Sequence, residues 1–300
     1  GSEMCIRDRT KVVRSEGFCH GHLLRAYERG CAVIDQPGEQ QIFPLLGAAG
    51  VGKSETIMNL LSEYPQQQNS QGKITKPVIH VSCPVEPNQR SVALSIIRGL
   101  QGRVLSRMGT SDVVEQVLDQ LRIAEVKTII FDEVQHLAEN LSSGNMKKAV
   151  NFLQFILENS SVSMILVGLP TAQRFINVDP SFQRRCLATE LVYPYAWVSQ
   201  AHRNDFVEGI GMIAEAYRDQ GWETVLDDPE SLKSLYAACM GRFGVLIDFL
   251  SHAETNNSRK VIDMKCLATA YAHCINHQPF SGNPFSPSTQ ISDHELNSEY

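Results

Sequence analysis

The chain has 300 residues, which is enough for one large domain or two small ones with a sizeable hydrophobic core. Hydrophobic residues make up 43% and charged residues 20%, so collagen-like, low-complexity and wholly disordered chains are excluded. The 27 basic and 33 acidic side chains give a net charge of −6, so any nucleic-acid contact must come from a local basic patch.

The N-terminal stretch is expected to lie outside the folded domains. Gly1 and Ser2 resemble a cloning scar, and residues 3–9 resemble sequence foreign to the gene. We expect residues 1–14 to be scar or disordered and residues 15–40 to form an N-terminal helical segment. No secretory signal and no apolar run of transmembrane length is visible, so we expect no membrane partner and a cytoplasmic location.

Five apolar runs of strand length follow, and stretches with helical periodicity separate them. Strands are expected at residues 42–46, 78–83, 128–131, 163–167 and 187–193, and helices at 91–100, 113–123 and 149–157. This alternation predicts an α/β domain with a parallel, helix-covered sheet over residues 41–197. Pro44 lies inside the first run, where a central strand normally rejects proline, so we expect a bulge or a shortened strand there.

Strand signals stop at about residue 195, and the rest of the pattern is helical. Helices are expected at residues 201–219, 229–240, 243–255 and 264–277, which predicts an all-helical domain over residues 198–277. Residues 278–300 are rich in Pro, Ser, Asn and Gly and have almost no periodicity, so we expect a disordered or docking tail.

Residues 47–54 match the phosphate-loop pattern G-x-x-x-x-G-K-[ST] between a predicted strand and a helix expected from Ser54. The loop consists of Gly47, Ala48, Ala49, Gly50, Val51, Gly52, Lys53 and Ser54. Its glycines let backbone N–H groups point at phosphate oxygens, and the helix N-terminus favours negative charge. Lys53 is expected to reach the β- and γ-phosphates of ATP, and Ser54 to offer its hydroxyl to Mg²⁺.

Two carboxylates, Asp132 and Glu133, follow the third expected strand. They emerge at the C-terminal edge of the predicted sheet, where ligands bind in open α/β sheets. We expect Asp132 to hold Mg²⁺, and Glu133 to orient and polarise the attacking water. Arg184 and Arg185 lie just before the fifth strand, where a cation can stabilise charge on the γ-phosphate, within one subunit or from a neighbour.

Together these features resemble an AAA+ ATPase, and within that superfamily the TnsC/TniB transposition regulators. The resembling stretches are the run Phe131–Leu137, the turn at 167–172, the box at 182–185 and the segment at 83–87. The resemblance implies a five-stranded sheet in the order 5-1-4-3-2, a helical lid, and a ring or helical homo-oligomer of a bacterial protein that binds ATP or ADP. Glu55 and Arg242 are then expected to join the nucleotide pocket.

The resemblance also implies ATP-dependent assembly on double-stranded DNA and a link between transposase subunits and a target-selection protein of the TniQ type, as in CRISPR-associated transposons. It places the DNA-facing pore near the helix after Asp132-Glu133 and the segment after the second strand. We therefore expect DNA contacts from the basic residues there: Lys147, Lys148, Arg103 and Arg90.

Two positions depart from the family pattern. Gly168 stands near the place of the polar sensor residue at the end of the fourth strand, and Thr171 is the nearest hydroxyl. In the lid segment at residues 241–246, a glycine occupies the place of the sensor arginine, which Arg242 could replace from a shifted position. Both departures favour slow hydrolysis that acts as an assembly switch.

The main alternative is a replication-type AAA+ ATPase, such as an initiator, helicase loader or clamp loader. An initiator carries a winged-helix or helix-turn-helix domain, and the residues after 275 are too few and too polar for one. A bacterial clamp loader carries a zinc module, whereas the eight cysteines form no CxxC pair. A signalling NTPase is a third alternative, which usually carries long sensor or effector domains.

Overall fold

The computed structural model describes residues 21–36, 40–68, 72–103, 108–139, 143–255, 257, 259–274, 280 and 282–297. The segment expected as scar or disorder, residues 1–14, lies outside the described residues. The contacts divide the chain into an α/β unit, residues 22–49 and 56–192, and a helical unit, which takes residues 50–55 and the chain from 193 onward. The expected domain bounds at 41–197 and 198–277 stay predictions.

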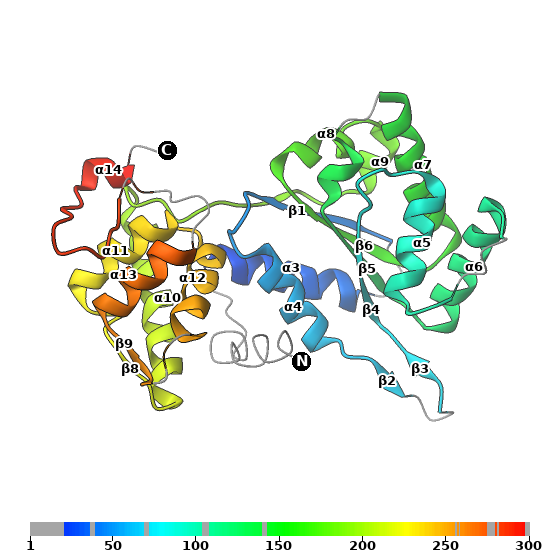
Figure 1. Cartoon of the computed structure of the whole chain (residues 1–300). Helices are drawn as coiled ribbons and strands as arrows, with labels where there is room; N and C mark the ends of the chain where they lie inside the picture. Colours follow the sequence, from blue (N-terminus) through cyan, green and yellow to red (C-terminus); the bar gives the residue numbers. More distant parts are fainter. Residues whose placement is uncertain are drawn as a thin grey trace. The chain divides into compact units, whose positions relative to one another are not determined.

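The α/β unit is built on a parallel sheet of five strands (Figure 1). Its strands are β1 (Ile42–Gly47), β4 (Val78–Ser82), β5 (Thr128–Asp132), β6 (Ser163–Gly168) and β7 (Glu190–Val192). They lie in the order β4-β5-β6-β1-β7. Counted along the chain within this sheet, the order is 5-1-4-3-2, so the expected fold class is confirmed. The central strands are fully buried, because helices cover both faces.

The predicted shortening of the strand at Pro44 is wrong, but the predicted irregularity is present on the β7 side: Ile42 lies opposite Cys186 and Leu45 opposite Glu190, so three residue steps of β1 face four of the partner segment. β1 pairs with β6 in unbroken register, with Pro44 opposite Leu166. On its other side, Ile42 O accepts a hydrogen bond from Leu187 N, and pairing with β7 resumes only at Leu45. Because backbone groups alternate between the two neighbours, Pro44 faces the gap between these contacts, where no ladder donor is needed.

Two helices cover one face of the sheet and a larger group covers the other. On the first face lie α3 (His22–Asp35) and α4 (Lys53–Glu63), and the Arg29 guanidinium of α3 lies 4.6 Å from the centre of the Phe43 ring. Arg29 also pairs with Glu190 of β7 at 2.5 Å, which ties α3 to the edge strand. The opposite face packs against α5 (Gln89–Gly99), α6 (Thr110–Ile123), α7 (Ser143–Asn159), α8 (Gln173–Ile176) and α9 (Pro180–Arg185).

Short elements complete this unit. Two 3-10 turns follow the central strands, η1 (Val134–Leu137) after β5 and η2 (Pro170–Ala172) after β6. A small antiparallel pair, β2 (Gln67–Gln68) and β3 (Ile74–Thr75), precedes β4. None of these elements has a periodic apolar pattern long enough to be read from the sequence.

The helical unit contains α10 (Gln200–Asp219), α11 (Pro229–Cys239), α12 (Phe243–Thr255) and α13 (Met264–Cys274), with a small parallel pair of β8 (Glu223–Thr224) and β9 (Val261–Ile262). Its core is aromatic: the Phe206 ring lies 5.3 Å from both Tyr236 and Phe243. Among the described residues, no single helix has the length and apolar character to cross a bilayer, although the bent pair α11–α12 passes on combined length and composition.

The described residues 280 and 282–297, where a disordered or docking tail was expected, are ordered and pack on the helical unit. Phe285 is 2% exposed and stacks on Phe249 of α12, with ring centres 5.4 Å apart. Further along, in α14 (Asp293–Asn297), Asp293 accepts a hydrogen bond from the Trp197 indole, and Leu296 is fully buried. A few large apolar side chains thus fix a polar segment to its own helical unit, because each ring buries a large area.

Candidate nucleotide site

The phosphate-loop sequence connects β1 to α4. Gly47 ends β1 opposite Val192 of β7, and α4 begins at Lys53. Gly50 and Gly52 have φ values of 76° and 111°, which side-chain-bearing residues rarely adopt. The motif therefore has the expected local form, a strand, a glycine turn and a helix N-terminus, and such an N-terminus attracts anions.

Within the helical unit, the loop residue Gly50 contacts the start of α12. Its carbonyl oxygen accepts a hydrogen bond from Gly244 N at 2.8 Å. A Cβ atom on Gly244 would lie 2.7 Å from that oxygen, so this position has no room for a side chain. The structure thus gives a steric reason for a glycine in the lid segment at 241–246. Arg242 precedes it, and its N–H donates to Cys239 O.

The two carboxylates expected in catalysis lie where β5 ends, at the C-terminal edge of the sheet. Asp132 is partly exposed; its Oδ1 accepts a hydrogen bond from Glu133 N, and its Oδ2 lies 3.4 Å from His80 Nε2 of β4. Glu133 is exposed and adopts left-handed backbone angles, φ 57° and ψ 37°. A non-glycine residue in this region is strained, and such strain is common at functional sites.

Cys83 follows β4 and lies next to these carboxylates. Its backbone N–H donates to Asp132 O at 2.9 Å, and its thiol side chain is buried. Burial, with smaller contributions from the charges of Asp132 and Glu133, raises the pKa of Cys83 far above its ordinary value. The thiol therefore stays neutral and acts as apolar packing under the site.

Gln135, in η1, contacts both Glu133 after β5 and Leu169 after β6. This residue was not identified from the sequence. Its Nε2 donates to a carboxylate oxygen of Glu133, and its Oε1 accepts from Leu169 N at 3.0 Å. The side chain is buried, with 4% exposed. A Cβ atom on Gly168 would lie 2.7 Å from Gln135 Oε1, so the glycine at the end of β6 makes room for this amide. Nothing in the sequence alone signalled that contact.

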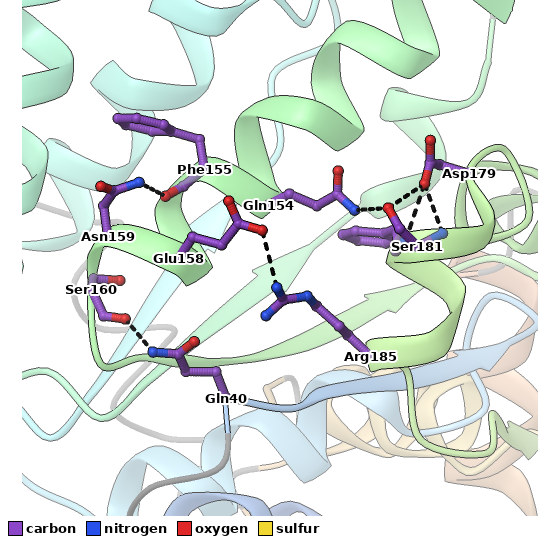
Figure 2. Close-up of polar contacts among 10 residues, drawn as sticks. Gln40, Gln154, Phe155, Glu158, Asn159, Ser160, Asp179, Ser181 and Arg185 are labelled. Carbon is purple, nitrogen blue, oxygen red and sulfur yellow. Dashed lines mark hydrogen bonds and ion pairs between the residues drawn. The ribbon is translucent and has the colours of Figure 1, made fainter.

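The arginine pair sits at the C-terminal end of α9, which is held in place from both ends (Figure 2). Asp179 caps the helix through Ser181 N at 2.8 Å, and Phe182 is buried against Phe175. Arg185 pairs with Glu158 of α7 at 3.0 Å, and Gln154 of the same helix donates to Ser181 Oγ (Figure 2). Arg184 is exposed, and its side chain makes no hydrogen bond or ion pair with the described part of the chain.

Comparison with known proteins identifies the family. The profile of the family described as "Bacterial TniB protein" matches residues 24–193, more than half of the chain. The chain belongs to the TniB family. The predicted resemblance to TnsC/TniB regulators is thus confirmed at the level of the family. None of the curated proteins compared with the sequence matches it.

Solved structures support the AAA+ fold of this TniB-family chain. The ORC1 protein of Aeropyrum pernix, solved in complex with DNA, has 18% identity and a TM-score of 0.57, and the alignment covers 84% of this chain and 64% of that one. Cdc6p from Pyrobaculum aerophilum has 16% identity and a TM-score of 0.60, covering 89% and 71%. A Walker-type ATPase of Pyrococcus abyssi has 16% identity and a TM-score of 0.52, covering 77% and 67%.

The four basic residues expected to contact DNA differ in their surroundings in this TniB-family chain. Lys147 and Lys148 are exposed on α7, and Lys148 lines a pocket of about 460 Å³ with Asn88, Phe152 and other residues. Arg90 of α5 donates to Met108 O at 2.7 Å, so its guanidinium supports the turn before α6. Arg103 is exposed and lies beyond α5, which ends at Gly99.

The residues expected to hold Mg²⁺ have suitable chemistry. Ser54, in the first turn of α4, is exposed, and Asp132 is partly exposed; both offer oxygen atoms. Mg²⁺ prefers oxygen ligands and in nucleotide sites takes only one or two from the protein, together with phosphate and water. In the described ranges, no cluster of three or more His, Cys, Asp and Glu side chains could hold a metal ion.

Proposed function

We propose that this TniB-family chain is an ATP-dependent, DNA-binding oligomeric regulator of transposition whose ATPase acts as a switch. The observation that carries the proposal is the combination of a full phosphate-loop motif on β1–α4 with Asp132 and Glu133 at the end of β5. Both β1 and β5 are strands of one parallel sheet and end at the same edge. Ligands of such sheets bind at that edge.

The residues divide the chemistry between them. Backbone N–H groups at 48–54 and the Lys53 ammonium would bind the phosphates, with Glu55 in the same turn of α4. Ser54 and Asp132 would hold Mg²⁺, which, when bound, neutralises phosphate charge. Glu133 would accept a proton from, or orient, the water that attacks the γ-phosphate. Arg185, with Arg184 as second choice, would stabilise the transferring phosphoryl group of a neighbouring subunit.

Lys53→Ala tests the nucleotide site. The variant should lose ATP affinity and hydrolysis, because the phosphates lose the point charge that the loop supplies. Equilibrium dialysis with labelled ATP measures the affinity directly. Lys73→Ala, which removes a surface lysine from beside Glu125, is the matched control and should bind ATP normally. Unchanged ATP binding and hydrolysis in Lys53→Ala would contradict the proposal.

Duplex DNA is the second proposed partner, bound by repetition of a small basic patch around an oligomer. Lys147→Ala combined with Lys148→Ala should flatten the salt dependence of DNA binding, since each neutralised phosphate adds about −0.9 to the log–log slope. Fluorescence anisotropy of a labelled duplex at several salt concentrations, with and without ATP, gives that slope. A wild-type slope in the double variant, or DNA binding that ignores ATP, would count against the assignment.

Transposase subunits and a TniQ-type target-selection protein are the proposed protein partners, and recruitment would be the output. A replication-type AAA+ ATPase is the second candidate, because the similar ORC1 and Cdc6p chains share the fold. Co-sedimentation of ATP-assembled, DNA-bound protein with the transposase encoded beside its gene favours the first candidate. Loading of a replicative helicase on the same DNA favours the second.

A further inference from the structure

The end of β6 lacks a polar side chain at the position where one was expected to face the nucleotide site. Gly168 occupies that position, and Thr171, the nearest hydroxyl, instead bonds to the Glu139 carboxylate at 3.4 Å. The Gln135 side chain of η1, which follows the neighbouring strand β5, fills the space beside Gly168. There, Gln135 Oε1 comes so close that a Cβ atom on residue 168 would lie 2.7 Å away.

The orientation of the Gln135 amide is fixed by its partners. The Glu133 carboxylate accepts hydrogen bonds and the Leu169 N–H donates one, so Nε2 must face Glu133 and Oε1 must face Leu169. The reverse orientation would place like groups together at both ends. The neighbours Val134 and Leu137 are fully buried and anchor η1 on both sides of this residue. Burial of the amide makes each unmade bond costly.

We propose that Gln135 is the positioning residue for the Glu133 carboxylate and replaces a polar side chain at the end of β6. The proposal rests on the proposed ATPase function, because it assigns Glu133 the water-activating role. Gln135 restricts an otherwise exposed carboxylate to one direction and links it to the backbone of the turn after β6. Gly168 is part of the same arrangement, because only a residue without a side chain leaves room for the Gln135 amide.

Gln135→Glu separates the two bonds. The new carboxylate retains an oxygen for Leu169 N–H but offers Glu133 no donor and adds like charge. We expect kcat to fall about 10-fold or more, the range seen when groups that orient a catalytic residue are removed, while KM changes little. Gln200→Glu on α10, whose exposed amide donates to Asn204 Oδ1, is the matched control and should retain wild-type kcat.

Gly168→Ala, at the end of β6, should disturb the same Gln135–Glu133 hydrogen bond. The added methyl group should displace the Gln135 amide and lower kcat by a similar factor, although no polar group is removed. In Gln135→Ala, the further change Gly168→Asn should restore part of kcat, because the new amide starts from β6. A second readout uses nucleotide-free protein: the Gln135 side-chain amide should give a shifted, slowly exchanging NMR signal that Gly168→Ala or Glu133→Ala abolishes.

The outcomes separate this inference from the proposed function. Wild-type kcat in both Gln135→Glu and Gly168→Ala, with Glu133→Gln inactive, would overturn the positioning role alone. Loss of ATP binding in parallel with kcat would also overturn it, since that result indicates a structural role. If wild-type protein fails to hydrolyse ATP, the proposed function and the positioning role both fall. Circular dichroism melting curves exclude variants that do not fold.

Discussion

Two polar contacts, one at the end of β5 and one between α9 and α7, hold charged side chains in different ways. Gln135 is buried and bonded at both ends, and it fixes the Glu133 carboxylate to η1 and to the turn after β6. Arg185 instead meets Glu158 on the surface, where the two side chains are 36% and 56% exposed (Figure 2). The Gln135 contact is therefore buried, whereas the Arg185–Glu158 pair is exposed to solvent.

This contrast in burial indicates which part of the proposed site is already oriented in a single chain. Leaving a buried hydrogen-bonding group without its partner costs about 1–3 kcal/mol, so the direction of Glu133 is set before any assembly. A surface ion pair contributes about 0–1 kcal/mol, so Arg185 can leave Glu158 when a better anion is offered. An arginine that acts on a neighbour's phosphate needs that freedom.

Removal of the Glu133 carboxylate should slow hydrolysis more than any other change at these two contacts. Glu133→Gln should bind ATP normally but hydrolyse it about 10³-fold more slowly, because an amide cannot accept the proton from water. Single-turnover hydrolysis with excess enzyme measures the step, and ATP affinity is the control. ATP-gated oligomers of this variant should live longer. Wild-type turnover would assign the role to another residue.

A smaller loss is expected from the surface arginine. Arg185→Ala should lower the rate about 100-fold, less than the largest effects of arginine fingers, because we expect slow hydrolysis from a lid segment with glycine at the expected place of the sensor arginine. Mixing Arg185→Ala with Lys53→Ala should restore activity, since one subunit offers an intact pocket and its neighbour an intact arginine. Arg184→Ala in the same mixing experiment shows which guanidinium acts. No recovery at any ratio would contradict a shared site.

The smallest effect should come from the partner of that arginine. Glu158→Gln frees Arg185, so activity below saturating protein concentration should rise by at most about 5-fold, the equivalent of 1 kcal/mol. High salt should remove the difference between the variant and wild type, since exposed pairs are screened. Glu115→Gln, an exposed carboxylate on α6, is the matched control. A rise far above this limit would mean that the pair is a strong lock.

The central sheet was predictable because its strands are continuous apolar runs between helical patterns. β6 and α12 begin at the predicted residues, and β5 ends one residue after its predicted end. The edge strand β7 is shorter than expected, because its pairing with β1 is interrupted beside Pro44. The first turns of α7 were missed, since exposed polar side chains such as Lys147 and Lys148 leave no apolar period there.

The motifs of the candidate site were predictable, but the contacts that orient them were not. The phosphate loop and the pair Asp132-Glu133 have fixed local spacing, so the sequence displays them. Gln135 and Gly168 come from different strands, and only the fold brings them together. Burial of Phe285 likewise depends on α12 and α13, because a polar segment with few apolar residues gives no periodic signal.

The packing of Phe285 and Leu296 also sets an order of events during protein synthesis. Both residues leave the ribosome after α10 to α13, whose aromatic core they complete. Domains generally fold as units during translation, so the α/β sheet can close while the helical unit still exposes Phe249 and Tyr271. Until they are covered, these rings form an exposed hydrophobic surface, and chaperones that bind apolar segments should bind the nascent chain there.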